Sequence, residues 1–285
     1  MTGLPEVVVE ALDLAFGLGI DRLDAHLLLA HVLDRPRTWL LAHDDASLDS
    51  GSAQAYMSLC RQRAAGAPVA YLIGHKEFWG HRLQVTPAVL VPRPETELLV
   101  DWGLQLLSGP LEGRDAPMVV DLGTGSGAIA ITLALACQTA QVFATDISQN
   151  AIAVAQVNAN RLQARVRFFQ GSWWRAVAGH RFDLALSNPP YIRGADHHLA
   201  ALTAEPAAAL TPGALGTEAL DELVLGAGGH LIDGGWLVLE HGADQGAHVR
   251  DRLVSCGFGQ VETRRDLAGL ERCTGGCLLR PKPTI

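Results

Sequence analysis

Four consecutive residues, Asn188-Pro189-Pro190-Tyr191, have the properties of a site that holds a planar NH₂ group. The two prolines fix the backbone and remove two amide donors, which leaves the neighbouring carbonyl oxygens free to accept hydrogen bonds. The side-chain oxygen of Asn188 is a second acceptor. The ring of Tyr191 suits stacking on such a group or facing a sulfonium. The alternative is a structural Pro-Pro turn in which Tyr191 only packs.

An amide nitrogen needs such a site if it is to be methylated. Its lone pair is delocalised into the carbonyl group, so it is a poor nucleophile. Attack on a sulfonium methyl group places positive charge on the nitrogen, and acceptors fixed around its hydrogens stabilise that charge. In this interpretation Asn188 and the carbonyl group of Pro189 orient the NH₂ group. We predict the following catalytic residues: Asn188, Pro189, Pro190 and Tyr191.

A glycine-rich segment, residues 121–127, indicates where the methyl donor binds. Glycines allow a sharp turn and a close approach of the backbone to a ligand. Gly123, Gly125 and Ala128 also match the relaxed dinucleotide pattern. Asp121 favours S-adenosylmethionine, because a carboxylate there attracts a methionyl ammonium group and repels pyrophosphate. A turn that binds no ligand is the remaining alternative. The predicted cofactor contacts in this segment are Asp121, Gly123, Thr124, Gly125, Ser126 and Gly127.

Asp146 is the predicted ribose-binding residue. It ends the next predicted strand, where a carboxylate can accept both ribose hydroxyls of either cofactor class. Asp146 and Ser148 also precede a predicted helix, so a helix N-cap is a compatible interpretation. Asn188 is expected to contact the cofactor as well as the substrate.

These residues lie at the ends of strands in an α/β pattern. Beyond Pro117, strand-like and helix-like segments alternate, which predicts an open, doubly wound, Rossmann-like sheet of seven strands. The predicted strands are 119–122, 142–145, 166–170, 182–187, 236–240, 261–264 and 277–280. The predicted helices are 127–136, 149–161, 218–231 and 244–255. The last two strands suggest an antiparallel edge pair. Ligands bind at the carboxyl ends of such strands, so the loops after Leu122, Thr145, Gln170 and Ser187 should converge.

The first part of the chain predicts a small helical domain. Apolar residues recur at helical spacing in segments 4–16, 21–34 and 52–65. Residues 77–91 have the pattern of a hairpin, and helix resumes over 95–107. We therefore expect a helical domain at 1–75, a hairpin linker at 76–95 and a methyltransferase domain at 96–285.

The composition of the chain indicates which partners and which cellular location to expect. The net charge is −8, and residues 1–75 hold nine acidic residues against five arginines, or −4, which argues against direct nucleic-acid binding. No apolar run is long enough to span a membrane, and no basic leader suggests a signal peptide. Five cysteines without paired spacing predict a reducing, cytoplasmic location. The eleven histidines show no metal-ligand spacing, so no metal is expected, and we expect a monomer.

With these motifs in place, nearly the whole chain resembles the release factor glutamine methyltransferase family. The resemblance is carried by segments 76–80, 91–97, 123–127 and 188–191, by Asp146, by Glu205 with Pro206, and by segments 23–30, 240–242 and 265–269.

One departure concerns the residues after the third predicted strand. Family members often have an acidic residue before a tryptophan there, whereas this chain has Ser172 before Trp173. The resemblance still implies cofactor contacts at both positions. Ser172 can hydrogen-bond the adenine amine, and Trp173 can stack on the adenine ring.

The resemblance also implies the substrate. It is the glutamine of the Gly-Gly-Gln motif in class I peptide chain release factors, with the helical domain docking that protein. A sister group methylates a glutamine of a large-subunit ribosomal protein, but segment 92–97 resembles the release factor group more closely. Other readings are an adenine-amine DNA methyltransferase, an RNA base methyltransferase, a nicotinamide oxidoreductase and a non-catalytic binding module. The first needs a basic recognition domain, which the acidic residues 1–75 do not provide.

Overall fold

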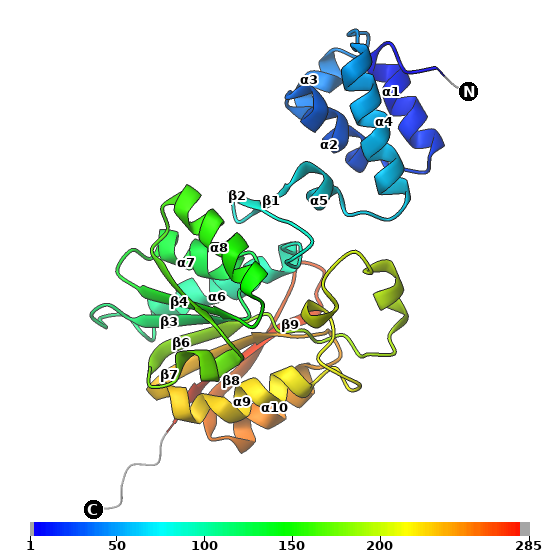
Figure 1. Cartoon of the computed structure of the whole chain (residues 1–285). Helices are drawn as coiled ribbons and strands as arrows, with labels where there is room; N and C mark the ends of the chain where they lie inside the picture. Colours follow the sequence, from blue (N-terminus) through cyan, green and yellow to red (C-terminus); the bar gives the residue numbers. More distant parts are fainter. Residues whose placement is uncertain (1–2, 280–285) are drawn as a thin grey trace, which may run out of the picture. The chain divides into compact units, whose positions relative to one another are not determined.

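The computed structural model describes residues 3–279, and the chain divides into two compact units between His75 and Lys76 (Figure 1). Each unit encloses a hydrophobic core of its own. Within the described residues, no helix is both long enough and apolar enough to cross a membrane.

The N-terminal unit is helical, as predicted. Its helices are α1 (Val8–Gly17), α2 (Arg22–Leu33), α3 (Arg37–Ala42), α4 (Ser50–Ala64) and α5 (Val69–Ile73). The side chains of Asp21 and Asp49 cap α2 and α4 by accepting hydrogen bonds from backbone amides of the first turn. Helices α3 and α5 were not predicted, because segments of six and five residues are too short for a periodic pattern.

The second unit is built on a seven-stranded mixed sheet, which confirms the predicted fold class. Its strands are β3 (Met118–Leu122), β4 (Gln141–Asp146), β5 (Val166–Gln170), β6 (Phe182–Ser187), β7 (Leu231–Glu240), β8 (Phe258–Arg265) and β9 (Glu271–Leu278). They lie in the order β5-β4-β3-β6-β7-β9-β8. Strand β9 runs antiparallel to both β7 and β8, and the other pairings are parallel. In sheets of this kind, ligands bind at the carboxyl ends of the parallel strands.

Helices cover both faces of this sheet (Figure 1). They are α6 (Glu97–Leu107), α7 (Ala128–Ala136) and α8 (Gln149–Leu162) on one face, and α9 (Glu218–His230) and α10 (Gly246–Ser255) on the other. Consecutive residues of β3 point into opposite cores, with Val119 under the first group and Val120 under the second. Because both faces are covered, the central strands β3 and β6 are mostly apolar.

Several boundaries differ from the sequence prediction, and the largest difference is at β9, which starts at Glu271 and not at residue 277. The predicted hairpin pattern over 77–91 forms pairs only at β1 (His75–Phe78) and β2 (His81–Gln84), and Val85 to Val91 is an irregular segment. Strand β7 starts at Leu231, five residues earlier than predicted, with a register shift against β6. The prediction started the strand after Gly234 and Gly235, because adjacent glycines are typical of a turn. The last position of the predicted strand 277–280, Arg280, lies outside the described residues.

Candidate active site

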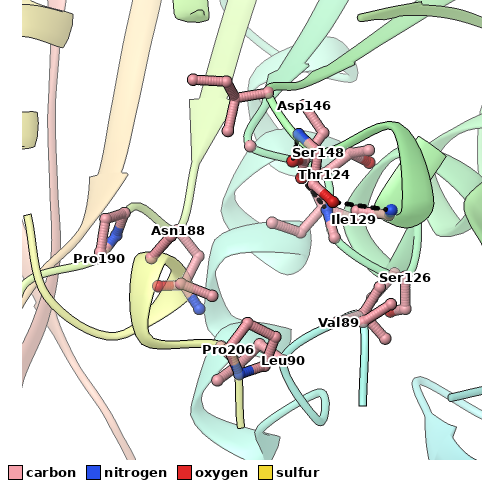
Figure 2. A pocket seen from close by; sticks show the side chains of 18 of the residues that line it. Val89, Leu90, Thr124, Ser126, Ile129, Asp146, Ser148, Asn188, Pro190 and Pro206 are labelled. Atoms are coloured by element: carbon pink, nitrogen blue, oxygen red, sulfur yellow. Dashed lines mark hydrogen bonds between the residues drawn. The ribbon is translucent and has the colours of Figure 1, made fainter. Parts of the chain in front are cut away.

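A cavity of about 440 Å³ lies at the carboxyl ends of β3, β4, β5 and β6. The loops after these four strands all reach it, as the alternating pattern predicted. Figure 2 shows Asn188 and Pro190 on the opposite side of this cavity from Asp146 and Ser148. Nine predicted site residues line it: Gly123, Thr124, Gly125, Ser126, Asp146, Ser172, Trp173, Asn188 and Pro190. Four others are not part of its lining: Asp121, Gly127, Pro189 and Tyr191.

The loop at residues 121–127, here called the cofactor loop, is shaped by glycines that no other residue replaces easily. Gly123 has φ +80°, and a Cβ atom there would lie 2.8 Å from Cζ3 of Trp173. Gly127 has φ +86°, and its Cβ atom would lie 2.7 Å from Cδ1 of Ile131. Both positions need the left-handed backbone and the absence of a side chain. The loop is therefore an open cradle of backbone at the end of β3.

Asp121 lies beneath this cradle rather than on its surface. Its side chain is fully buried, and Oδ2 accepts hydrogen bonds from Thr124 Oγ1 at 2.6 Å and from the Ala130 amide at 3.2 Å. Oδ1 has no hydrogen-bond partner among the described residues. Burial raises the pKa of this carboxyl group to about 7. Asp121 thus connects the cofactor loop to the first turn of helix α7, and its Oδ1 atom is left without a partner among the described residues.

Asp146 links two loops. Its Oδ2 atom accepts a hydrogen bond from the Gly125 amide at 2.9 Å, and Oδ1 accepts one from the Ser148 amide at 2.9 Å (Figure 2). Burial raises its pKa, although these amides oppose the shift. The helix N-cap itself is Ser148, whose hydroxyl accepts from the Ala151 amide. A carboxylate offers about four lone-pair sites, so Asp146 retains acceptor capacity toward the cavity.

The loop after β5 brings Trp173 against the cofactor loop. Trp173 begins a short 3₁₀ helix, η2 (Trp173–Val177), with φ +42°. Its indole ring reaches the space where Gly123 lacks a side chain. Trp174, by contrast, is buried and donates its indole N–H to the Leu223 carbonyl oxygen. Only the first of the two tryptophans therefore faces the cavity.

Asn188 follows directly after β6 and enters the cavity beside Thr96. The hydroxyl of Ser187 donates to the Leu122 carbonyl oxygen, which ties the end of β6 to the end of β3. The Asn188 side chain donates through Nδ2 to Thr96 Oγ1 at 3.0 Å. With Nδ2 engaged in this way, the Oδ1 atom of Asn188 is the acceptor left for a ligand.

Tyr191 turns away from the cavity toward β7. Its hydroxyl donates to Glu240 Oε1 at 3.3 Å, and burial together with the Glu240 carboxylate raises the pKa of the phenol. Glu240 ends β7 and is 1% exposed. Burial raises the pKa of Glu240 to about 7, against the lowering effects of Thr96, Arg272 and Tyr191. A buried carboxyl group therefore lies behind the Asn-Pro-Pro-Tyr segment.

Two further segments line the cavity, and their positions in the sequence do not indicate this. Residues 88–93 line one side and residues 206–212 line another. Glu205 joins them, because it accepts a hydrogen bond from the Val91 amide at 3.1 Å and pairs with Arg93. The Glu205-Pro206 and 91–97 segments were noted as motifs, but nothing in their spacing indicated that they meet.

Family models match both parts of the chain. Residues 14–74 match the PrmC N-terminal domain, and residues 96–214 match the methyltransferase small domain. Among solved structures, a methyltransferase from Pyrococcus furiosus is 19% identical with a TM-score of 0.53, covering 71% of this chain and 91% of that one. A T. thermophilus 16S rRNA methyltransferase, solved with AdoMet and guanosine, is 20% identical with a TM-score of 0.54, covering 72% and 49%. At these identities the likeness concerns the fold.

Relatives of higher identity cover nearly the whole chain. A Bordetella pertussis protein named release factor glutamine methyltransferase is 50% identical, over 93% of this chain and 98% of that protein. A Xylella fastidiosa protein of the same name is 48% identical, over 90% and 93%. The chain is therefore a methyltransferase, and it belongs to the release factor glutamine methyltransferase family.

Proposed function

We propose that this enzyme transfers a methyl group from S-adenosylmethionine to the side-chain amide nitrogen of a glutamine, in the Gly-Gly-Gln motif of class I peptide chain release factors. One observation carries the proposal. The acceptor side chain of Asn188 shares a single cavity with the glycine cradle and with Asp146. The names of the relatives support the choice of substrate.

The residues of the cavity fit S-adenosylmethionine. Gly123 and Gly125 line the cavity with backbone in the left-handed region and without side chains, and Asp146 has acceptor capacity for ribose hydroxyls. Trp173 and Ser172 line the cavity as partners for an adenine ring. When bound, this cofactor supplies an electrophilic methyl group on a sulfonium.

Asp121 acts on the cofactor through charge rather than through the cavity lining. Its unpartnered Oδ1 atom lies beneath the loop, where a nearby cationic ligand favours the ionised carboxylate. Attraction to the methionyl ammonium group therefore remains our assignment for Asp121.

The enzyme's own contribution to the reaction is orientation and charge stabilisation. Asn188 Oδ1 and the carbonyl oxygen of Pro189 accept the two amide hydrogens of the substrate glutamine. The positive charge that develops on the nitrogen is stabilised by these two fixed acceptors. Pro190 lines the cavity and restricts the backbone at this point. Tyr191, which bonds to Glu240, anchors the motif from behind.

The two units divide the work. We assign substrate docking to the helical residues 1–75, connection to residues 76–95 and methyl transfer to residues 96–285. The enzyme acts as a monomer in the cytoplasm, where release factors work, and binds no nucleic acid directly.

The test is transfer of radiolabelled methyl groups to a purified class I release factor. Its Gly-Gly-Ala variant, the large ribosomal subunit proteins and duplex DNA serve as parallel substrates. Label on the wild-type factor alone is expected. Asn188→Ala should lower turnover by about 10²–10³-fold while leaving the circular dichroism spectrum unchanged. Label on ribosomal protein or DNA in place of the factor would overturn the choice of substrate.

A further inference from the structure

The amide methylation proposed above depends on which end of the Asn188 side chain faces the substrate. The oxygen end accepts a hydrogen bond, whereas the NH₂ end only donates. The two ends have nearly the same shape, so a half-turn of the amide fits the same space. If the Asn188 amide were rotated by half a turn, its NH₂ group would face the NH₂ group of the substrate glutamine and repel it. The protein therefore needs a feature that fixes this orientation.

Thr96 is the hydrogen-bond partner of the NH₂ end of the Asn188 side chain. Nδ2 of Asn188 lies 3.0 Å from Thr96 Oγ1, and Thr96 is 4% exposed. A threonine hydroxyl has one proton and two acceptor lone pairs, so alone it would accept either end of the asparagine amide. The direction of the Thr96 proton decides which end it accepts.

Glu240 is the group that can draw this proton away. Its side chain is almost fully buried, and Tyr191 donates to Oε1, whereas Oε2 has no hydrogen-bond partner among the described residues. No hydrogen bond joins Thr96 to Glu240 among the described residues, but the Thr96 hydroxyl lies near enough to lower the pKa of Glu240, so its proton can turn toward the unpartnered Oε2. When the Thr96 proton points to Glu240, the Thr96 lone pairs are left for Nδ2 of Asn188.

We propose that Glu240 and Thr96 form a positioning relay that holds the oxygen of Asn188 toward the substrate amide. The relay runs from the Glu240 carboxylate through the Thr96 hydroxyl to Nδ2 of Asn188. Neither Thr96 nor Glu240 is a catalytic residue in this scheme, because both act through Asn188. The inference rests on the proposed function for the identity of the substrate.

The energetics of Glu240 favour this role over a merely structural one. A buried carboxylate with an unpaired oxygen is costly, and burial raises the pKa of Glu240 to about 7. A carboxyl group whose pKa is raised on folding lowers stability as pH rises from its unfolded value, near 4.5, to about 7. The enzyme thus retains a group that destabilises the fold at neutral pH, which is typical of a functional position.

The relay makes turnover depend on the ionisation of Glu240. A protonated Glu240 can donate to Thr96 Oγ1, and the Thr96 proton can then point to Asn188 and select the wrong end of the amide. Turnover should therefore fall as pH falls through about 7. The other charged or titratable groups near Glu240 are Glu95, Tyr191, Arg272 and Cys273, and Asp266 pairs with Arg272. The Arg272 guanidinium favours the ionised form, and Glu95 opposes it.

The experiment compares wild type with Thr96→Val, Thr96→Ser and Glu240→Gln on a purified release factor, using saturating S-adenosylmethionine. We expect Thr96→Val to lower kcat by about ten- to a hundredfold, the usual effect of losing an outer-shell partner. Thr96→Ser keeps the hydroxyl and should recover most of the turnover. The affinity for S-adenosylmethionine, measured by calorimetry, should stay near that of wild type in all three variants. The pH profile of Glu240→Gln should lack the decrease in kcat below pH 7.

Two results would overturn the relay, and both are separate from the proposed function. One is a Thr96→Val enzyme with the kcat of wild type, and the other is a Glu240→Gln enzyme with the same acidic decrease as wild type. The second measurement stands even if Thr96→Val fails to fold. Failure of the proposed function would appear differently, as wild-type enzyme that places no label on the Gly-Gly-Gln glutamine.

Discussion

Asn158 on helix α8 and Gln84 at the end of β2 exchange two hydrogen bonds across 74 residues of sequence. The Gln84 amide donates to Asn158 Oδ1 at 2.7 Å, and Asn158 Nδ2 donates to the Gln84 carbonyl oxygen at 2.9 Å. The same Nδ2 atom also donates to the Ser126 carbonyl oxygen at 2.9 Å. One buried side chain therefore ties the hairpin to the cofactor loop at Ser126, next to the residue that Asp146 holds, Gly125.

Replacement of Asn158 by alanine should weaken both the fold and the cofactor site. The change leaves the partly buried amide of Gln84 and the buried carbonyl oxygen of Ser126 without these partners, at a cost of up to about 1–3 kcal/mol per unsatisfied group. Urea unfolding should show a lower midpoint, and calorimetry should show weaker binding of S-adenosylmethionine. Asn160→Ala, at an exposed position of the same helix, is the matched control. Equal midpoints for the two variants would contradict this role of Asn158.

Asp146→Ala should act mainly on cofactor affinity. The change removes the acceptor of the Gly125 and Ser148 amides together with the proposed ribose contact. Hydrogen bonds to a charged group contribute about 1.5–3 kcal/mol each, so the Kd for S-adenosylmethionine should rise by at least about tenfold. At saturating cofactor, kcat should change much less than Kd. Calorimetry that gives an unchanged Kd would reject the ribose assignment.

The stability of the second unit should carry a pH signature of Asp121. Burial raises the pKa of this carboxyl group from 3.8 to about 7, so the folded state holds a proton that the unfolded chain releases. Wild-type stability therefore decreases as pH rises from about 4 to about 7. Asp121→Asn removes this contribution. The difference between its urea midpoint and that of wild type should therefore shift in favour of the variant between pH 4 and pH 8. A difference that is the same at both pH values would show that Asp121 titrates alike in the folded and unfolded chain.

The fold and half of the site follow from the sequence because their signals are local. The alternation of strands and helices predicted the doubly wound sheet, and the position of a loop after each strand predicted that Asp146 and Asn188 lie around one cavity. Asp121 shows the limit of this reasoning. Its position in the sequence suggested a cofactor contact, but its side chain at the end of β3 points beneath the loop. Side-chain direction at a strand end depends on packing, which spacing does not contain.

The parts of the site that sequence reasoning missed are those that depend on contacts between distant segments. Asn158 looks like one polar residue among several on an amphipathic helix, and only the meeting of α8 with β2 gives it a role. Thr96 likewise reads as a helix-start residue, although it contacts Asn188 from 92 residues away. Glu240 lies in segment 240–242, which carries part of the family resemblance. The sequence contained no indication that it is buried against Tyr191.

The last prediction concerns Glu205, which joins two walls of the cavity. Its side chain is 3% exposed, accepts a hydrogen bond from the Val91 amide and pairs with Arg93. Glu205→Ala leaves the Val91 amide without this acceptor and the Arg93 guanidinium without this partner, which removes the link between segments 88–93 and 206–212. Because both segments line the cavity, S-adenosylmethionine should dissociate faster, as measured by stopped-flow fluorescence of Trp173.

The exposed pair of Arg193 and Asp244 provides the comparison for Glu205. Its atoms lie 2.8 Å apart, as in a good ion pair, but the two side chains are 59% and 67% exposed. Such a pair contributes about 0–1 kcal/mol, so Asp244→Asn should leave the dissociation rate close to that of wild type. Equal rates in the Glu205 and Asp244 variants would mean that the cavity walls hold together without Glu205. A faster rate in Glu205→Ala alone would show that the buried link retains the cofactor, since solvent screens the exposed pair and not the buried one.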